Sequence, residues 1–195
     1  MDDISVIGGD GLINMLSGTP AILDRYRASQ YFLSMHFRCE GIAQPVWYVR
    51  AALAEFKAAV ETVASGLPES HKKAAWKKSE ASVTLQKCAL TKALGKLRDI
   101  AFHTNQHIEH ASVFRYQIAT FSEPLTCSLQ SIFFSPLTPS RETKKSNITQ
   151  KEIEWFNRQS QHWPAYHLIE EAWFLLGTKI SSFKGIQRGI QRGSN

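Results

Sequence analysis

Apolar residues recur at steps of three and four along most of this 195-residue chain, the spacing of one face of an α-helix. The first such run covers residues 19–38, with Thr19 at an N-cap position and Pro20 in the first turn. A second helix is predicted from Pro45 to the stop signals at Gly66 and Pro68. The predicted core residues of these two helices are Ile22, Tyr26, Leu33, Phe37, Val46, Val49, Leu53, Phe56, Val60 and Val63.

A third long helix is predicted to begin near Glu69 and to run into the segment "KLRDIAFHTNQHIEH", residues 96–110. Its apolar residues fall seven apart, a seam that suits a helical bundle: Trp76, Val83, Leu90 and Leu97. Further along, Thr149 and Glu152 form a capping-box pattern ahead of Ile153 and Phe156. The last helix is predicted to start at Pro164, with an apolar face of Tyr166, Ile169, Trp173, Leu176, Ile180 and Phe183.

The period of the pattern changes after His110. The stretch "SVFRYQIATF" alternates and is rich in β-branched and aromatic residues, and "TCSLQSIFF" does so less strictly. The intervening "SEPL", with Pro124, is typical of a turn, so a β-hairpin is predicted over about residues 112–134. The predicted fold class is therefore mainly α: a bundle of about five helices with one inserted β-hairpin.

One helical domain is expected over residues 19–184, between two less regular ends. Residues 1–18 are glycine-rich and are expected to form a flexible lead-in. A nucleotide-binding glycine turn at "VIGGDGLINML" is disfavoured, because Asn14 stands where the fingerprint needs glycine and no strand–helix–strand unit follows. Residues 185–195, where "GIQR" occurs twice, are expected to form a basic disordered tail.

Composition limits the class of protein. The chain is 43% hydrophobic and 21% charged, as in globular proteins, and its net charge of +6 favours acidic partners such as RNA. Three scattered cysteines without CxxC spacing indicate a reducing cytoplasm, so the expected localisation is cytoplasmic. No signal peptide and no run of 18 apolar residues is found, so no membrane contact is expected.

The histidines of residues 96–110 raise the question of a metal site. On a continuous helix His103, His107 and His110 would share one face, as zinc ligands do. However, no glutamate lies between the first two, as a metalloprotease helix requires, and Glu109 does not lie where it would orient a ligand. Neither a metal nor another cofactor is therefore expected.

The sequence "RDIAFH", Arg98 to His103, resembles the arginine–polar–x3–histidine signature of the HEPN superfamily, small helical bundles found in many RNA-cleaving toxins and defence proteins. The polar position is Asp99, and the three residues that follow it are apolar. The resemblance implies a metal-independent endoribonuclease with Arg98, Asp99 and His103 as catalytic residues, and a toxin or anti-phage role. "RQSQH", Arg158 to His162, is an imperfect internal copy of such a spacing.

The motif residues suit RNA cleavage chemically. Histidine titrates near neutral pH and can exchange the proton of a ribose 2′-hydroxyl, while arginine can bind the phosphate with two N–H groups. On an ideal helix, residues five apart are about 140° apart, so Arg98 and His103 would not converge. In the family the motif lies at a helix end or kink and two subunits pool their motifs. The resemblance therefore implies an irregularity near Gly95 and a homodimer or higher homo-oligomer.

Lysines and arginines outside the motif are candidate RNA contacts. The predicted RNA-binding residues lie around Trp76 and in the loop "SPLTPSRETKKSN": Lys72, Lys73, Lys77, Lys78, Arg141, Lys144 and Lys145. Trp76 itself fits the apolar seam better than a base-stacking role.

The alternative function is a non-catalytic helical module that binds RNA or a protein partner. A regulatory protein partner is also expected for a toxic ribonuclease. In some toxins of the family a tyrosine two residues after the histidine is modified by such a partner; this chain has Asn105 there, which disfavours that mode of control.

Overall fold

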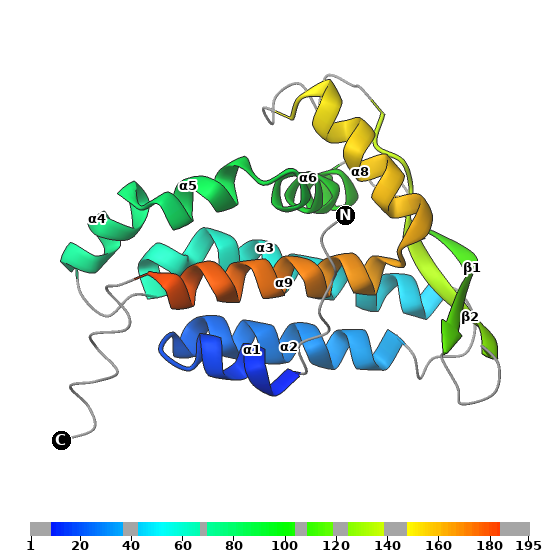
Figure 1. The fold of residues 1–195 in the computed structure, drawn as a ribbon, viewed down its shortest axis with the longest axis horizontal. Coiled ribbons are helices and arrows are strands. Elements are labelled where there is room, and N and C mark those ends of the chain that lie inside the picture. The colour runs from blue at the N-terminus through cyan, green and yellow to red at the C-terminus, as the bar shows by residue number, and fades with distance from the viewer. Residues whose placement is uncertain are drawn as a thin grey trace.

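The computed structural model describes residues 9–36, 43–66, 70–103, 109–118, 125–138 and 148–183. Within these ranges the chain forms eight helices and one two-stranded antiparallel sheet (Figure 1). The elements are α1 (Gly9–Leu16), α2 (Pro20–His36), α3 (Ala43–Gly66), α4 (Ser70–Lys78), α5 (Glu80–Lys87), α6 (Ala89–His103), β1 (Glu109–Ile118), β2 (Leu125–Phe134), α8 (Gln150–His162) and α9 (Ala165–Ser182). The prediction of a mainly helical fold with one inserted hairpin is confirmed.

Helices α2, α3 and α9 form the centre of the bundle, and Trp173 of α9 lies where they meet. Its ring packs edge-on against Tyr26 of α2 and Phe56 of α3, with centroids 5.4 and 5.5 Å away. The indole N–H donates a 2.9 Å hydrogen bond to the Oγ of Ser29, whose hydroxyl donates to the Ala52 carbonyl. A fully buried indole is thus both packed and satisfied, which joins three helices at one point.

The predicted helix periods hold in α2, α3 and α9. Ile22, Tyr26 and Leu33 are buried, while Phe37 lies outside the described residues. In α3 and α9 the predicted core faces are buried except for residues at their edges, which are half-buried: Val46, Val60, Tyr166 and Phe183. The capping box of α8 is also confirmed: Glu152 N–H donates to Thr149 Oγ1 at 3.3 Å, and Thr149 N–H donates to Glu152 Oε2 at 2.7 Å.

The expectation of a flexible lead-in over residues 1–18 is wrong for its second half. Gly9–Leu16 is a helix, and its Leu12 and Leu16 are buried in the common core. Gly177 of α9 is the reason α1 can approach so closely, because a Cβ at that position would collide with Cδ1 of Leu12. Two buried leucines outweigh the helix-disfavouring glycines.

The single long helix predicted from near Glu69 into residues 96–110 is also wrong: the chain forms three helices, α4, α5 and α6. Ser79 has extended backbone angles, and its hydroxyl accepts the N–H of Ser82, so it caps α5 and ends α4. Cys88 is extended in the same way between α5 and α6. The breaks disturb the predicted seam: Trp76, Leu90 and Leu97 are buried, but Val83 is 37% exposed.

The irregularity expected near Gly95 is absent, because α6 is a continuous α-helix from Ala89 to His103. Gly95 instead lies against the Lys57 side chain of α3: a Cβ there would lie 3.3 Å from Nζ of Lys57. A small residue in a helix interior can serve packing without bending the helix, and burial of the surrounding turns offsets its weak helix propensity.

The hairpin lies at one end of the bundle, with β1 paired to β2 from Glu109↔Phe134 to Ile118↔Leu125 (Figure 1). It begins three residues before the predicted start. Most of its predicted turn, 122–124, lies outside the described residues, as does the predicted tail, 185–195. Ile132, Phe133 and Phe134 are buried at the base, where β2 packs against α3, α8 and α9. Among the described helices, none is long and apolar enough to cross a membrane.

Candidate functional site

The "RDIAFH" motif lies where α6 leaves the protein core. Residues 93–97 of this helix are all buried, and the next two, Arg98 and Asp99, are partly exposed, with side-chain exposures of 34% and 37%. α6 packs against α3, α5, α8 and α9, so its middle is enclosed on several sides. The arginine and aspartate are therefore held by a rigid helix at a point that solvent, and hence a substrate, can reach.

Arg98 and Asp99 are brought together by the structure. Nη1 of Arg98 donates to Oδ1 of Asp99 at 3.3 Å. This contact is long for a charge-assisted hydrogen bond and is one-third exposed, so solvent screens it. Asp99 thus lies where its carboxylate can orient the Arg98 guanidinium.

His103 is the last residue of α6, and its side chain lies outside the described part of the chain. The helix backbone still fixes its position relative to the other two motif residues. Position 103 is about 140° around the axis from Arg98 but only about 40° from Asp99, four residues earlier. On one chain, therefore, the histidine position shares a side of α6 with Asp99 and not with Arg98.

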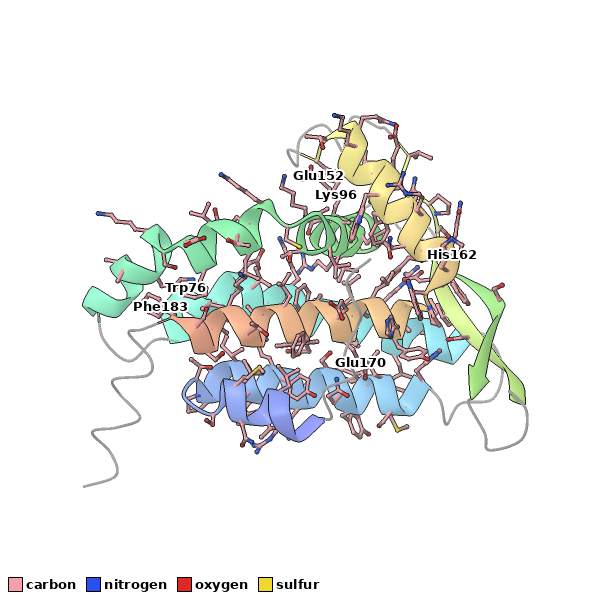
Figure 2. All side chains as sticks on the ribbon, in the orientation of Figure 1. Trp76, Lys96, Glu152, His162, Glu170 and Phe183 are labelled. Carbon is pink, nitrogen blue, oxygen red and sulfur yellow. The ribbon has the colours of Figure 1, made fainter. Side chains whose placement is uncertain are left out.

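Two further cations lie on that side of α6, at positions 92 and 96. Nζ of Lys92 donates to Oε1 of Glu152, the N3 residue of α8, at 2.8 Å. Lys96, also on α6, is only 7% exposed. Figure 2 labels both Lys96 and Glu152, the residue of α8 that binds Lys92. Burial opposes ionisation of Glu152, but hydrogen bonds from Lys92 and Thr149 outweigh it and lower the pKa of this carboxyl.

A second ion pair fixes the chain after the motif. Arg50 of α3 binds Glu109, the first residue of β1, through Nε and Nη2, with distances of 2.9 Å to Oε1 and 2.9 Å to Oε2. The carboxylate has no exposed side-chain surface and the guanidinium is 12% exposed. This bidentate pair holds the start of the hairpin on α3, six residues after His103.

Sequence reasoning missed both Arg50–Glu109 and Lys92–Glu152. Their partners are 59 and 60 residues apart, so no local spacing could indicate them. The only available signal was the position of each acidic residue at the start of an element, Glu109 before a β-like run and Glu152 in a capping box.

The predicted RNA-binding lysines lie apart from the motif. Lys77 and Lys78 are exposed in the last turn of α4, which packs on α3 and α5 at the far end of the bundle from the hairpin (Figure 1). Trp76, which precedes them, is 4% exposed and meets Phe183 edge-on at 5.4 Å, which confirms it as a core residue. The side chains of Lys72 and Lys73, and all of Arg141, Lys144 and Lys145, lie outside the described residues.

Within the described residues no group of three or more histidine, cysteine, aspartate or glutamate side chains is placed to hold a metal ion. The three histidines considered as ligands are only partly described. His107 and the side chains of His103 and His110 lie outside what the structure describes.

Comparison with known proteins adds no further evidence on the site: no protein-family model, curated protein or solved structure matches this chain.

Proposed function

We propose that this protein is a metal-independent endoribonuclease of the HEPN type, with Arg98, Asp99 and His103 as its catalytic residues. The observation that carries the proposal is the place of the motif in the fold. α6 is buried through Leu97 and becomes accessible at Arg98 and Asp99, which are bonded to each other at 3.3 Å. Partial exposure at the end of a buried helix is what a catalytic arginine and aspartate would need in order to meet a substrate.

The chemistry follows from the three side-chain types. In the proposed reaction His103 accepts the proton of a ribose 2′-hydroxyl, whose oxygen then attacks the adjacent phosphorus and expels the 5′-oxygen of the next nucleotide. The guanidinium of Arg98 stabilises the negative charge that grows on the phosphate oxygens. Asp99 orients that guanidinium and lies one helical turn before His103. The departing 5′-oxygen takes up a proton from solvent, and the His103 imidazolium returns one to solvent, so the products are a 2′,3′-cyclic phosphate and a 5′-hydroxyl.

The proposal requires two copies of the chain. α6 is continuous, so Arg98 and position 103 diverge by about 140° on a single helix. Two copies with their α6 ends facing each other would place Arg98 of one copy near His103 of the other. We therefore propose a homodimer or a higher oligomer built from such pairs.

RNA would be held mainly through its phosphates. The exposed Lys77 and Lys78 of α4, together with Lys72 and Lys73 on the same helix and the loop cations Arg141, Lys144 and Lys145, are the proposed contacts. Because α4 lies at the end of the bundle away from the hairpin, its lysines would contact RNA at a distance from the cleaved bond (Figure 1).

The test is cleavage of an unstructured RNA in excess chelator by wild type and by Arg98→Ala, Asp99→Asn and His103→Ala. We expect wild type to cut and to leave cyclic phosphate ends, and His103→Ala to be about 10²- to 10⁴-fold slower. Arg158→Ala and His162→Ala are the matched controls, since both are exposed on α8 and imitate the motif spacing (Figure 2 labels His162). Activity lost in chelator and restored by zinc or magnesium would contradict the proposal.

A second function remains a candidate: a non-catalytic helical module that binds RNA or a protein partner. The observation that favours it is that Arg98 and Asp99 bond to each other on an unbroken helix, as two surface residues would. Wild type that binds RNA through Lys77 and Lys78 but never cleaves it would support this function.

The cellular role proposed is that of a toxin or anti-phage effector in the cytoplasm, held silent by a regulatory protein. This part rests on the motif resemblance alone. Growth arrest on expression of wild type, but not of His103→Ala, would support it.

A further inference from the structure

Lys57 of α3 lies next to the candidate site, although it is far from the motif in sequence. Helix α3 lies below α6 in the view of Figure 1, and the two helices pack against each other. The Lys57 side chain runs past Gly95 of α6: a Cβ at Gly95 would lie 3.3 Å from Nζ of Lys57, 3.4 Å from Cδ and 3.7 Å from Cε. The ammonium group of Lys57 therefore lies against α6 at Gly95.

Gly95 is one helical turn before the first two motif residues. It precedes Arg98 by three residues and Asp99 by four on a continuous helix, and around the helix axis it lies between them, about 60° from Arg98 and 40° from Asp99. Since Cβ positions three or four residues apart are about 6 Å from each other, the Lys57 ammonium lies within about 9 Å of the Cβ atoms of Arg98 and Asp99. Helix α3 thus adds a cation to the side of α6 that carries the motif.

Solvent reaches both cations. The Lys57 side chain is 26% exposed, and that of Arg98 is about one-third exposed. Gly95 itself is buried, so the aliphatic part of Lys57 is covered while its charged end remains accessible. A ligand approaching the interface between α3 and α6 would meet two positive charges that come from different helices.

Both cations contact acidic residues of their own helix at long distances. Nζ of Lys57 lies 3.2 Å from Oε1 of Glu61, four residues later, and Arg98 donates to Asp99 at 3.3 Å. In the first pair the lysine precedes the glutamate, which is the less favourable order on a helix, and Glu61 is exposed. Lys92 of α6, by contrast, binds a carboxylate of α8 at 2.8 Å. Solvent screens the two local contacts, so an anionic ligand can replace them at low cost.

A phosphate group suits this pair of cations. A guanidinium binds phosphate oxygens with two N–H groups, while an ammonium binds them as a point charge. Because Arg98 and Lys57 belong to two packed helices, their separation is fixed before the ligand arrives. The net charge of +6 also favours an anionic ligand over a cationic one.

We propose that Lys57 and Arg98 together bind one phosphate group, which lies at the interface between α3 and α6. The inference deepens the proposed function by adding a phosphate-binding residue outside the motif, and it rests on that function only for RNA as the source of the phosphate. Binding of the phosphate is measured without cleavage.

The experiment is fluorescence anisotropy of the full chain with labelled 2′-O-methyl oligouridylate, which cannot be cleaved because it lacks the attacking hydroxyl. Lys57→Met keeps the aliphatic part of the side chain and should bind about tenfold more weakly, the effect of losing one charged hydrogen bond. Lys57→Arg should bind like wild type. Lys87→Met, at an exposed lysine of α5, removes the same charge elsewhere and is the matched control.

Salt dependence distinguishes a lost phosphate contact from a structural effect. The plot of log affinity against log salt should be shallower by about 0.7 in Lys57→Met, the value for one phosphate of a single strand, and unchanged in Lys57→Arg. Circular dichroism checks that each variant is folded. If Lys57→Met is not folded, Lys57→Gln takes its place, since its amide is polar and uncharged.

A double-mutant cycle tests whether the two cations bind the same phosphate. Lys57→Met and Arg98→Ala together should cost less affinity than the product of their separate losses, because the second change removes part of an interaction that is already broken. Lys87→Met and Arg98→Ala, which share no ligand group, should give losses that multiply.

Inorganic phosphate distinguishes the source of the ligand. Compared with chloride at equal ionic strength, it should raise the urea midpoint of wild type and not that of Lys57→Met. If Lys57→Met loses this response while its affinity for the oligouridylate is unchanged, the site binds a small phosphate compound and not RNA, and the phosphate site itself stands.

Two results would overturn the inference. One is Lys57→Met that changes neither oligouridylate affinity nor the response to inorganic phosphate; the other is a cycle in which the losses from Lys57→Met and Arg98→Ala simply multiply. Failure of the proposed function is separate. Binding that depends on Lys57 without any RNA cleavage keeps this inference and removes the enzyme, while cleavage that depends on His103 but not on Lys57 does the reverse.

Discussion

Two arginine–carboxylate pairs, Arg50–Glu109 and Arg98–Asp99, lie on either side of the end of α6 and differ in what surrounds them. Arg50 binds Glu109 through two nitrogens at 2.9 Å, and the carboxylate is fully enclosed. Arg98 reaches Asp99 through one nitrogen at 3.3 Å, with about a third of each side chain exposed. The first pair joins two elements 59 residues apart, whereas the second joins neighbours on one helix.

The comparison separates an ion pair that holds the fold from one that is available for chemistry. A buried, bidentate pair cannot release its guanidinium to a substrate without leaving a charge in the interior. A long, exposed pair contributes little to stability and can exchange partners at low cost. Arg50 therefore positions the chain after the motif, and Arg98 is the arginine that the proposed function assigns to the phosphate.

The largest expected effect is on the buried pair. Arg50→Ala leaves Glu109 charged and enclosed, so the free energy of unfolding should fall by about 3–5 kcal/mol. Urea denaturation followed by circular dichroism measures this loss. The double variant Arg50→Met, Glu109→Leu should recover most of it, because no charge is then left unpaired. If the double variant is no more stable than Arg50→Ala, the pair is not the reason for the loss.

An intermediate effect is expected at Lys92–Glu152, whose side chains are 22% and 19% exposed. Lys92→Met should lower the free energy of unfolding by about 1 kcal/mol at neutral pH, since the pair is only partly shielded from solvent. Lys77→Met, at an exposed lysine of α4, is the control and should change stability by less than about 0.5 kcal/mol.

The same pair gives a pH dependence with a definite sign. The folded pKa of Glu152 is lowered from 4.5, so the unfolded chain binds the proton more readily. Its contribution to stability is complete above about pH 4.5 and is lost as the pH falls through the lower, folded pKa. Urea midpoints between pH 3 and pH 7 should show a shallower acid loss in Glu152→Gln than in wild type. Equal slopes would contradict this assignment.

Features with local causes could be predicted from the sequence, and features that depend on distant contacts, such as these ion pairs, could not. Periodicity identified the core faces of α2, α3 and α9, and local hydrogen-bonding patterns identified the α8 cap and the hairpin, because the causes of these features lie within a few residues. Sequence patterns failed where contacts between distant residues determine the structure. The packing of α1 through Leu12, for example, depends on Gly177 in α9. The break at Ser79 was missed because a serine cap can be overridden or used depending on tertiary packing.

The candidate site could be predicted from the sequence to a similar extent as the fold. Arg98 and Asp99 were identified from the motif, and the structure brings them together at an accessible place. The apolar period predicted a helix that runs through Gly95, as α6 does, and only the family resemblance implied an irregularity there. This continuity is what makes a second copy necessary to the proposed function.

The smallest expected effect on stability is that of Arg98→Ala. Its expected effect on RNA cleavage is large and is second to that of His103→Ala. Arg98→Ala removes the solvent-screened contact with Asp99, so the free energy of unfolding should change by less than about 1 kcal/mol. RNA cleavage should fall about 10²- to 10³-fold, because a cation facing the developing phosphate charge is lost. Arg98→Lys should restore stability fully and activity only in part, since an ammonium cannot bind two phosphate oxygens as a guanidinium does.

Urea denaturation and single-turnover cleavage, run on the same preparations together with Arg50→Ala, measure both quantities. If Arg98→Ala unfolds the protein as readily as Arg50→Ala does, both arginines hold the fold, and the assignment of Arg98 to catalysis loses its physical basis.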